Sequence, residues 1–211
     1  MTGVRLAALA AVLTVVCACT ADTSRARPDG STSAGSPTTT PALPFGGAPA
    51  VANPLPDLVL QGDPCVDALS HTQIRAIVGA DVAGRPEGFD AVGPGCGWHN
   101  LDTGYDVGVT YVVEPGTGLS GFYTLEAKIS QLRALPPIQG FPAITFPGNQ
   151  EGASRRWWCE ATVGLADQNA ITVRLTLGPA SRASSTDPCG PMLLEATAAV
   201  VDTLRAKAAR R

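Results

Sequence analysis

The stretch "YDVGVTYVV" at residues 105–113 alternates in polarity and predicts a β-strand with one buried face. Two later stretches, "WWCEATVGL" at 157–165 and "ITVRLTL" at 171–177, have the same period. The shared apolar face comprises Tyr105, Val107, Val109, Tyr111, Val113, Trp157, Cys159, Ala161, Val163, Leu165, Ile171, Val173, Leu175 and Leu177. The polar face comprises Asp106, Thr110, Glu160, Thr162, Thr172, Arg174 and Thr176. This pattern indicates an antiparallel sheet whose apolar side is covered by helices.

Helix starts are expected on both sides of these strands. Asp63 and Asp187 each precede a proline, so each aspartate fits an N-cap and each proline the first helical position. Ser70 is expected to begin a further helix, with Gln73 completing a capping box and Gly79 ending the helix.

Two longer helices and two more strands complete the predicted domain. A middle helix over about 122–135 would bury one stripe, and a last helix over 188 to about 206 another. These stripes are Phe122, Leu125, Ile129 and Leu132, then Cys189, Leu193, Ala196, Val200 and Leu204. Strands are expected at "CGW" (96–98) and "FPAITF" (141–146). The order helix, two strands, helix, three strands, helix predicts an α+β fold over residues 57–208, with a mostly antiparallel sheet covered on one face.

The chain begins with a signal for export. One charge at Arg5 leads into an apolar run to Val16, too short for a permanent membrane span. "VCAC" at 16–19 resembles a bacterial lipobox, in which Cys19 is lipidated after removal of residues 1–18. The alternative is ordinary cleavage with Cys19 as a bystander. Lipidation predicts a membrane-anchored protein on the outer face of the cytoplasmic membrane.

Residues 19–56 are expected to connect this anchor to the domain. The stretch after Cys19 is rich in Ser, Thr, Pro, Gly and Ala and has almost no large apolar side chain, so it predicts a disordered tether. A coil of this length would span roughly 30–35 Å.

The four remaining cysteines predict disulfides, because the exported chain enters an oxidising compartment. Of three possible pairings, Cys65–Cys96 and Cys159–Cys189 are favoured, because each joins a helix start to an inward-facing strand position. Each bridge would contribute about 3–4 kcal/mol. A zinc site is the alternative to these bridges, but the cysteines and histidines lack ligand-like spacing, so no metal is expected.

No motif predicts catalysis or a cofactor. "GTGLSG" at 116–121 matches a dinucleotide fingerprint, but no acidic residue follows at the required distance, so a flexible turn is expected. No Gly-x-Ser-x-Gly elbow occurs, and a triad would need His71 or His99. A net charge of −3 argues against nucleic acid as a partner. The chain is therefore predicted not to be an enzyme.

"SRRWWCE" at 154–160 is the strongest candidate for binding. Trp158 is in phase with the polar residues, so it is expected to point outward beside Arg155 or Arg156, as aromatic anchors do at interfaces. His99 and Arg174 are expected on the same polar face. The alternative is that a loop or the middle helix covers Trp158.

These features together resemble a family of small actinobacterial lipoproteins of unknown function, the LprB/LprC type of mycobacteria. The markers are the lipobox, "DPC" at 63–65, "GCGW" at 95–98, "GFPAI" at 140–144, "WCEATVGL" at 158–165 and the cysteine-led last helix. The resemblance implies export and anchoring, with no established ligand. We expect a non-catalytic module that binds an envelope protein, lipid or glycan. A small-ligand carrier with a pocket between sheet and helices is the alternative, and a hydrolase dependent on His99 a third.

Lipidation at Cys19 can be tested directly. We expect Cys19→Ala, or globomycin treatment of the wild type, to block maturation, because the modified thiol is what the lipoprotein pathway recognises. Mass spectrometry of the membrane fraction measures this. A mature mass unaffected by either treatment would contradict it.

Overall fold

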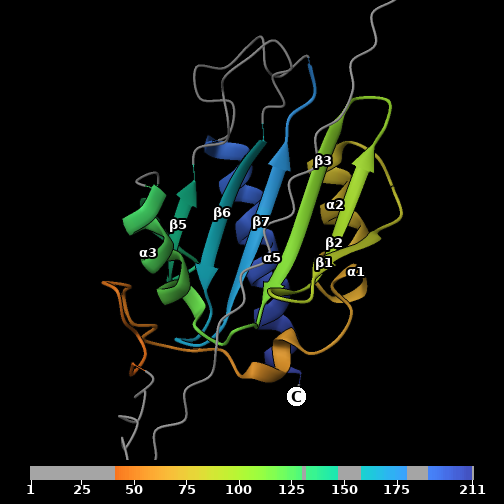
Figure 1. Cartoon of the computed structure of the whole chain (residues 1–211). Coiled ribbons are helices and arrows are strands. Elements are labelled where there is room, and N and C mark those ends of the chain that lie inside the picture. Colours follow the sequence, from red (N-terminus) through yellow and green to blue (C-terminus); the bar gives the residue numbers. More distant parts are fainter. Residues whose placement is uncertain (1–40, 130–131, 147–157, 180–189, 211) are drawn as a thin grey trace, which may run out of the picture. The chain divides into compact units, whose positions relative to one another are not determined.

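The computed structural model describes residues 41–129, 132–146, 158–179 and 190–210 of the 211-residue chain. These residues form an α+β fold, in which helices pack on a seven-stranded sheet (Figure 1). The sheet order is β1-β2-β3-β7-β6-β5-β4, and all neighbours are antiparallel. The strands are β1 (Arg85–Phe89), β2 (Gly93–Asn100), β3 (Tyr105–Val112), β4 (Arg133–Ile138), β5 (Phe141–Phe146), β6 (Trp158–Gly164) and β7 (Ala170–Thr176). The predicted α+β class and antiparallel sheet are confirmed.

Two meanders make up the sheet. Strands β1 to β3 form the first, and strands β4 to β7 form the second. The chain crosses from β3 through α3 (Gly118–Ile129) to β4 at the far edge, and the second meander then returns until β7 pairs with β3. The central pairing places Val109 opposite Val173 and Gly108 opposite Arg174.

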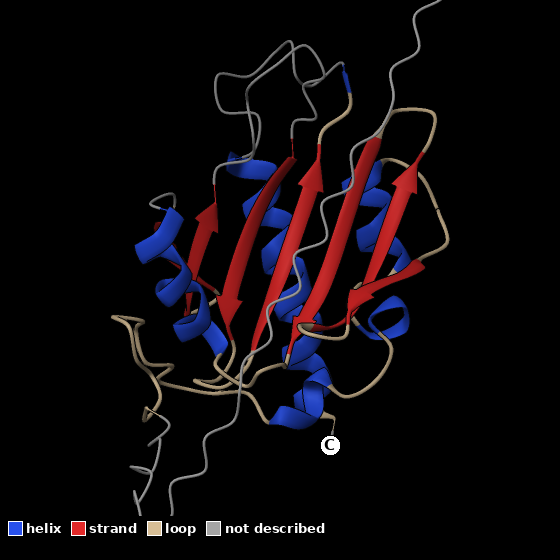
Figure 2. Ribbon diagram, in the orientation of Figure 1, coloured by secondary structure: helices blue, strands red, loops and turns tan. Residues whose placement is uncertain are grey.

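The apolar face of the sheet, called the inner face below, carries most of the helices. It contacts α1 (Pro64–Asp67), α2 (His71–Val78) and α5 (Gly190–Ala209), which lie behind the sheet in Figure 2. A 3₁₀ helix, η1 (Asp57–Leu60), packs against α5. The predicted stripe of α5 is buried at Leu193, Ala196, Val200 and Leu204. None of the helices in the described ranges is long and apolar enough to cross a membrane.

The predicted helix caps are present in the first half of the domain. The Asp63 side chain accepts a hydrogen bond from the Cys65 N–H at 2.8 Å. Ser70 and Gln73 form a capping box, and Gly79 ends α2 in the left-handed conformation with φ of 80°. Gln73 also donates to the carbonyl oxygen of Ala199 at 3.0 Å, which links α2 to α5.

One predicted disulfide is confirmed. Cys65 at the start of α1 is bonded to Cys96 in β2. Cys159 is buried on the inner face, as its phase predicts, but Cys189 lies outside the described residues. The second bridge therefore stays a prediction, as does the N-cap at Asp187, which also lies outside them.

The prediction missed two strands, and both lie at the edges of the sheet. β1 has the sequence RPEGF and β4 the sequence RALPPI. An edge strand tolerates proline because one side of it needs no hydrogen-bond donors. Part of the sequence of β4 was assigned to the middle helix, and the observed order is helix, three strands, helix, four strands, helix.

Helix α3 also differs from its prediction. It begins at Gly118, inside the "GTGLSG" stretch expected to be a turn, and it ends at Ile129. Leu125 is 51% exposed, so the predicted stripe is wrong there. Leu119 packs where Gly164 has no side chain, and the rings of Phe122 and Phe146 lie 6.1 Å apart. Gly164 and Phe146 belong to the polar side of the sheet, so α3 covers part of the face that was expected to be free of helices.

Residues that precede residue 57, the expected start of the domain, also contact the domain. Residues 40–211 form one compact unit. The backbone N–H of Phe45 donates to Ser120 Oγ at 3.0 Å, and that of Val51 donates to Asp167 Oδ1 at 2.9 Å. Val51 is also buried against the domain. The tether prediction for residues 19–40 concerns a segment outside the described residues.

Lys207, near the end of α5, is a buried charged residue that contacts η1 and α1. Its Nζ donates to Asp67 Oδ2 at 2.7 Å and to the carbonyl oxygens of Val59 and Gln61 at 2.9 Å each. The residue is 7% exposed. One ammonium group therefore joins α5 to η1, α1 and the turn between them.

We expect Lys207→Met to lower the free energy of unfolding by about 3 kcal/mol, because it leaves the Asp67 carboxylate and two carbonyls without their donor. Urea denaturation of the full chain measures the loss. Asp67→Asn introduced into Lys207→Met should recover part of it, whereas Arg210→Met, at an exposed position nearby, should change stability by less than about 0.5 kcal/mol. Equal stability of Lys207→Met and wild type would contradict this role.

Candidate functional site

The described residues cover only one half of the polar side of the sheet, which is called the outer face below. Helix α3 and residues 45–51 cover it near β5 and β6. Ile144 and Thr162 on this face are consequently fully buried. Over β2 and β3 the outer face carries Gly95, Gly97 and Gly108, which have no side chains. Charged side chains from neighbouring strands lie over these glycines.

Glu87 of β1 contacts both a histidine and an arginine on this surface. Its Oε1 lies 3.1 Å from His99 Nε2, and its Oε2 accepts a hydrogen bond from Arg174 at 3.2 Å. A Cβ at Gly97 would overlap the Glu87 carboxylate, and one at Gly108 would touch the Arg174 guanidinium. The two glycines therefore provide the space in which this ion pair lies.

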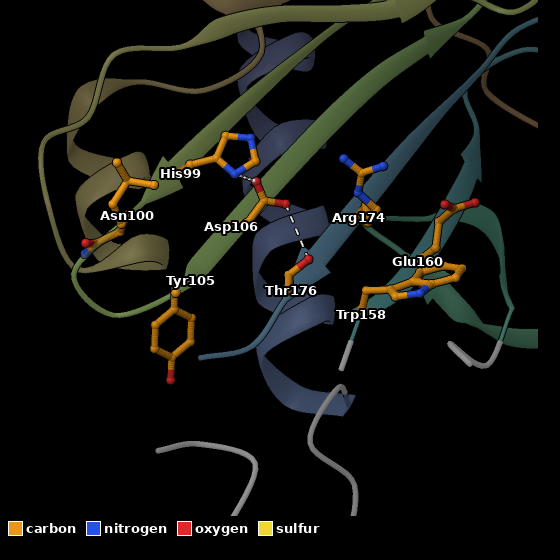
Figure 3. A pocket seen from close by; sticks show the side chains of 10 residues that line it. His99, Asn100, Tyr105, Asp106, Trp158, Glu160, Arg174 and Thr176 are labelled. Carbon is orange, nitrogen blue, oxygen red and sulfur yellow. Dashed lines mark hydrogen bonds and ion pairs between the residues drawn. The ribbon is translucent and has the colours of Figure 1, made fainter. Parts of the chain in front are cut away.

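Asp106 of β3 forms the second part of the cluster. Its Oδ2 pairs with His99 Nδ1, and its Oδ1 accepts a weak hydrogen bond from the Thr176 hydroxyl at 3.4 Å (Figure 3). Both ring nitrogens of His99 thus face carboxylates, and Thr176 is held by Asp106. In this arrangement His99 has no nitrogen left to accept a proton from a nucleophile.

Burial opposes the negative charge of two carboxyl groups here. Removal from water raises the pKa of Asp106 above its usual value, although His99 and Arg174 act to lower it. Burial likewise raises the pKa of Glu160, against the attraction of Arg174. Perturbed carboxyls gathered on an open surface indicate a binding or catalytic region rather than ordinary solvent-facing residues.

Glu160 and Trp158 project from the same face of β6. In the sheet, Glu160 lies between Arg174 of β7 and Phe146 of β5. Within the described residues the Glu160 carboxylate has no hydrogen-bond donor, since the contact of Arg174 is made to Glu87. Figure 3 shows the Trp158 ring next to Glu160. Trp158 is half-buried on the polar side, as its phase predicts.

These groups line an open hollow of about 560 Å³ at one end of β2, β3, β6 and β7. Its lining residues are His99, Asn100, Leu101, Gly104, Tyr105, Asp106, Trp158, Glu160, Arg174 and Thr176. The Asn100 amide is structural, since it donates to the Val78 carbonyl at 2.8 Å and accepts from the following turn. Leu101 at the rim is 87% exposed.

The structure brings together three residues that sequence reasoning proposed for binding, namely Trp158, His99 and Arg174. Arg155 and Arg156, proposed beside Trp158, lie outside the described residues. Asp106 and Glu160 were placed on the correct face but not recognised as site residues. Glu87 was missed because its strand was missed.

His71, the other histidine, lies away from this cluster. It is exposed on α2 and pairs with Asp81 at 3.0 Å. Together with Arg75 it lowers the pKa of Asp81. Within the described ranges, no group of three or more His, Cys, Asp or Glu side chains has the arrangement of a metal site.

A comparison with known protein families finds a match over most of the chain. The model of DUF3558, described as a protein of unknown function, matches residues 14–202. No curated protein matches the chain.

We expect Glu160→Gln to raise the thermal midpoint at pH 7 by about 2–4 °C. A raised pKa means that the folded state holds the proton more tightly than the unfolded state, so the wild type loses stability as pH rises from about 4.5 through the raised pKa. The glutamine is neutral throughout and avoids this loss.

The advantage of Glu160→Gln should therefore shrink towards pH 4, where wild-type Glu160 is protonated. Calorimetry from pH 4 to 7 measures the difference, and Glu195→Gln, at an exposed site on α5, serves as the matched control. A midpoint difference that is independent of pH would contradict the prediction.

Proposed function

The chain belongs to the DUF3558 family of unknown function, and we propose that it is a lipid-anchored binding protein of the cell envelope. Its ligand would occupy the hollow on the outer face. The observation that carries this proposal is Glu160, a half-buried carboxylate beside an aromatic ring on an open surface, with no donor among the described residues. The Glu160 carboxylate faces the open hollow, so a donor group of a ligand can reach it there.

The contacts of His99 favour binding over catalysis. A general base needs a free nitrogen or oxygen directed at the substrate. Here both nitrogens of His99 are paired with Glu87 and Asp106, and the Arg174 guanidinium is also paired with Glu87. Such mutual pairing fixes the side chains as a preformed surface. It supports a recognition role and gives little support to the hydrolase alternative.

The carrier alternative needs space between the sheet and the helices, and the packing there gives it little support. The largest side chains at this interface include Trp98, Tyr111, Leu175 and Leu204, each exposed by 1% or less. Side chains at this density leave few voids larger than a water molecule. The outer face is therefore the better-supported binding surface.

The anchoring part of the proposal rests on the lipobox at Cys19 and on the boundary of the folded unit. Because Phe45 is the first residue whose hydrogen bond to the domain is described, about 25 residues lie between the proposed anchor at Cys19 and this contact. A coil of that length would span about 25 Å. This shorter reach would keep the hollow near the membrane surface and favours partners located there.

Photocrosslinking in living cells tests the proposed surface. A benzophenone amino acid at Leu101, exposed at the rim, should give one defined adduct, because the ligand covers this position. The same amino acid at Val66 is the matched control, since Val66 is 75% exposed on α1, on the inner-face side. We expect the Leu101 adduct to be lost with Trp158→Ala.

Identical adducts at Leu101 and Val66, or a Leu101 adduct that persists in Trp158→Ala, would contradict the proposal. The mass of the adduct distinguishes the partner classes. A protein-sized increase supports a protein partner, and a lipid or glycan mass supports the other ligand types proposed from the sequence.

A further inference from the structure

We propose that the hollow binds the cationic side chain of a lysine or arginine, presented by an exposed segment of a protein partner. This inference rests on the proposed function, because it names the chemistry that the same surface recognises. Three features support it: the charges of the described residues, the Glu160 carboxylate, which has no donor among them, and the open lining of the hollow.

The charges of the described residues at and beside the hollow do not balance. Among these residues, three carboxylates, Glu87, Asp106 and Glu160, lie with one permanent cation, Arg174. With His99 neutral the net charge of these groups is −2, and with His99 protonated it is −1. The surface therefore favours a cation in either protonation state of the histidine.

Glu160 is the carboxylate that remains available. Glu87 accepts from Arg174 and faces His99, and Asp106 is paired with His99 and Thr176. Arg174 and Glu160 are direct neighbours across β7 and β6, yet the guanidinium is held over Gly108 and contacts Glu87. An incoming ammonium or guanidinium group would give Glu160 the charge-assisted hydrogen bond that no described residue supplies.

Trp158 supplies the second element of cation recognition. The indole of Trp158 lies beside Glu160 at the hollow (Figure 3). An indole face attracts ammonium and guanidinium groups through its quadrupole, by about 0.5–2 kcal/mol depending on desolvation. A carboxylate and an indole side by side therefore favour a cation over a neutral or anionic group.

The shape of the surface favours a protein segment as the source of this cation. The lining residues come from the outer face of the sheet, from the ends of β2 and β3 and from the turn between these strands, and no helix in the described ranges lines the hollow. A small amine in such a hollow would keep much of its hydration, whereas small-ligand sites enclose most of the ligand. A peptide segment would cover the hollow and pack against exposed Leu101 at its rim.

The direct test is a titration of the full chain, in nonionic detergent, with tetralysine that is acetylated only at its N-terminus and has free lysine side chains. Trp157→Phe serves as the background, so that Trp158 dominates the change in tryptophan fluorescence, because Trp98 is buried. We expect saturable binding that weakens at least tenfold in Glu160→Gln. Glu195→Gln removes the same charge at a distant exposed site and should leave the affinity unchanged, which separates the site from net charge.

Salt, pH and the probe itself provide further readouts. We expect affinity to fall with added salt, because the contact is an exposed ion pair. It should also fall from pH 7 to pH 4, because the Glu160 carboxylate, whose pKa is raised above its ordinary value, takes up a proton as the pH is lowered. The same peptide with acetylated lysine side chains should not bind.

Several outcomes would overturn the inference. The first is that the peptide with acetylated lysine side chains binds as tightly as tetralysine. The second is that Glu160→Gln and Glu195→Gln lose affinity equally, and the third is that tetralysine does not bind at all. Ethylammonium binding as tightly as the peptide would overturn the protein source. If the cation test fails while the Leu101 crosslink is obtained, the binding surface stands and only the ligand chemistry is wrong. If the crosslink also fails, the proposed function itself is wrong.

Discussion

The pairing of β3 with β7 is the constraint on which the rest of the structure depends. It joins two meanders that are separated in sequence by α3, over seven opposed residue pairs from Asp106–Thr176 to Val112–Ala170. A slip of one residue would move every side chain of one strand to the other face. The burial of Val107, Val109, Val173 and Leu175 on the inner face therefore fixes the register. The charged cluster on the outer face depends on that register.

The same pairing assembles the outer-face site from both halves of the chain. Glu87, His99 and Asp106 come from the first meander, and Trp158, Glu160 and Arg174 from the second. Gly108 lies opposite Arg174, so the long side chain of the second meander can lie across a bare part of the first and reach Glu87. Neither meander alone contains both members of this ion pair.

The two buried ionisable residues Lys207 and Glu160 differ in their hydrogen bonds. Lys207 is almost fully buried, and three oxygen atoms accept its hydrogen bonds, so its burial stabilises the junction of α5 with η1 and α1. Glu160 is partly buried beside Phe146 and Trp158 without a donor among the described residues, and its pKa is raised as a result. Burial of the Glu160 carboxylate lowers the stability of the fold, and no described residue offsets this loss with a hydrogen bond. Such a destabilising residue is better explained by a role in the proposed binding than by a role in folding.

The pattern of period two located strands β3, β6 and β7, because both faces of these central strands impose a strict choice between apolar and polar side chains. Capping chemistry located α1 and α2, since the signals at Asp63, Ser70 and Gly79 are local. The edge strands β1 and β4 gave no such signal. They pair on one side only, so proline and glycine are tolerated within them, and Glu87 was missed together with β1.

The sequence by itself determined which faces of the central strands are buried and where the first helices begin. These features follow from local periodicity and from capping, whereas the sequence only favoured the Cys65–Cys96 bridge among three pairings, and the structure contains it. Only the tertiary structure decided that α3 crosses the outer face, and that Glu87 reaches over Gly97 to His99 and Arg174. Both depend on contacts between segments far apart in the chain, whose relative positions are set by the order and register of the strands.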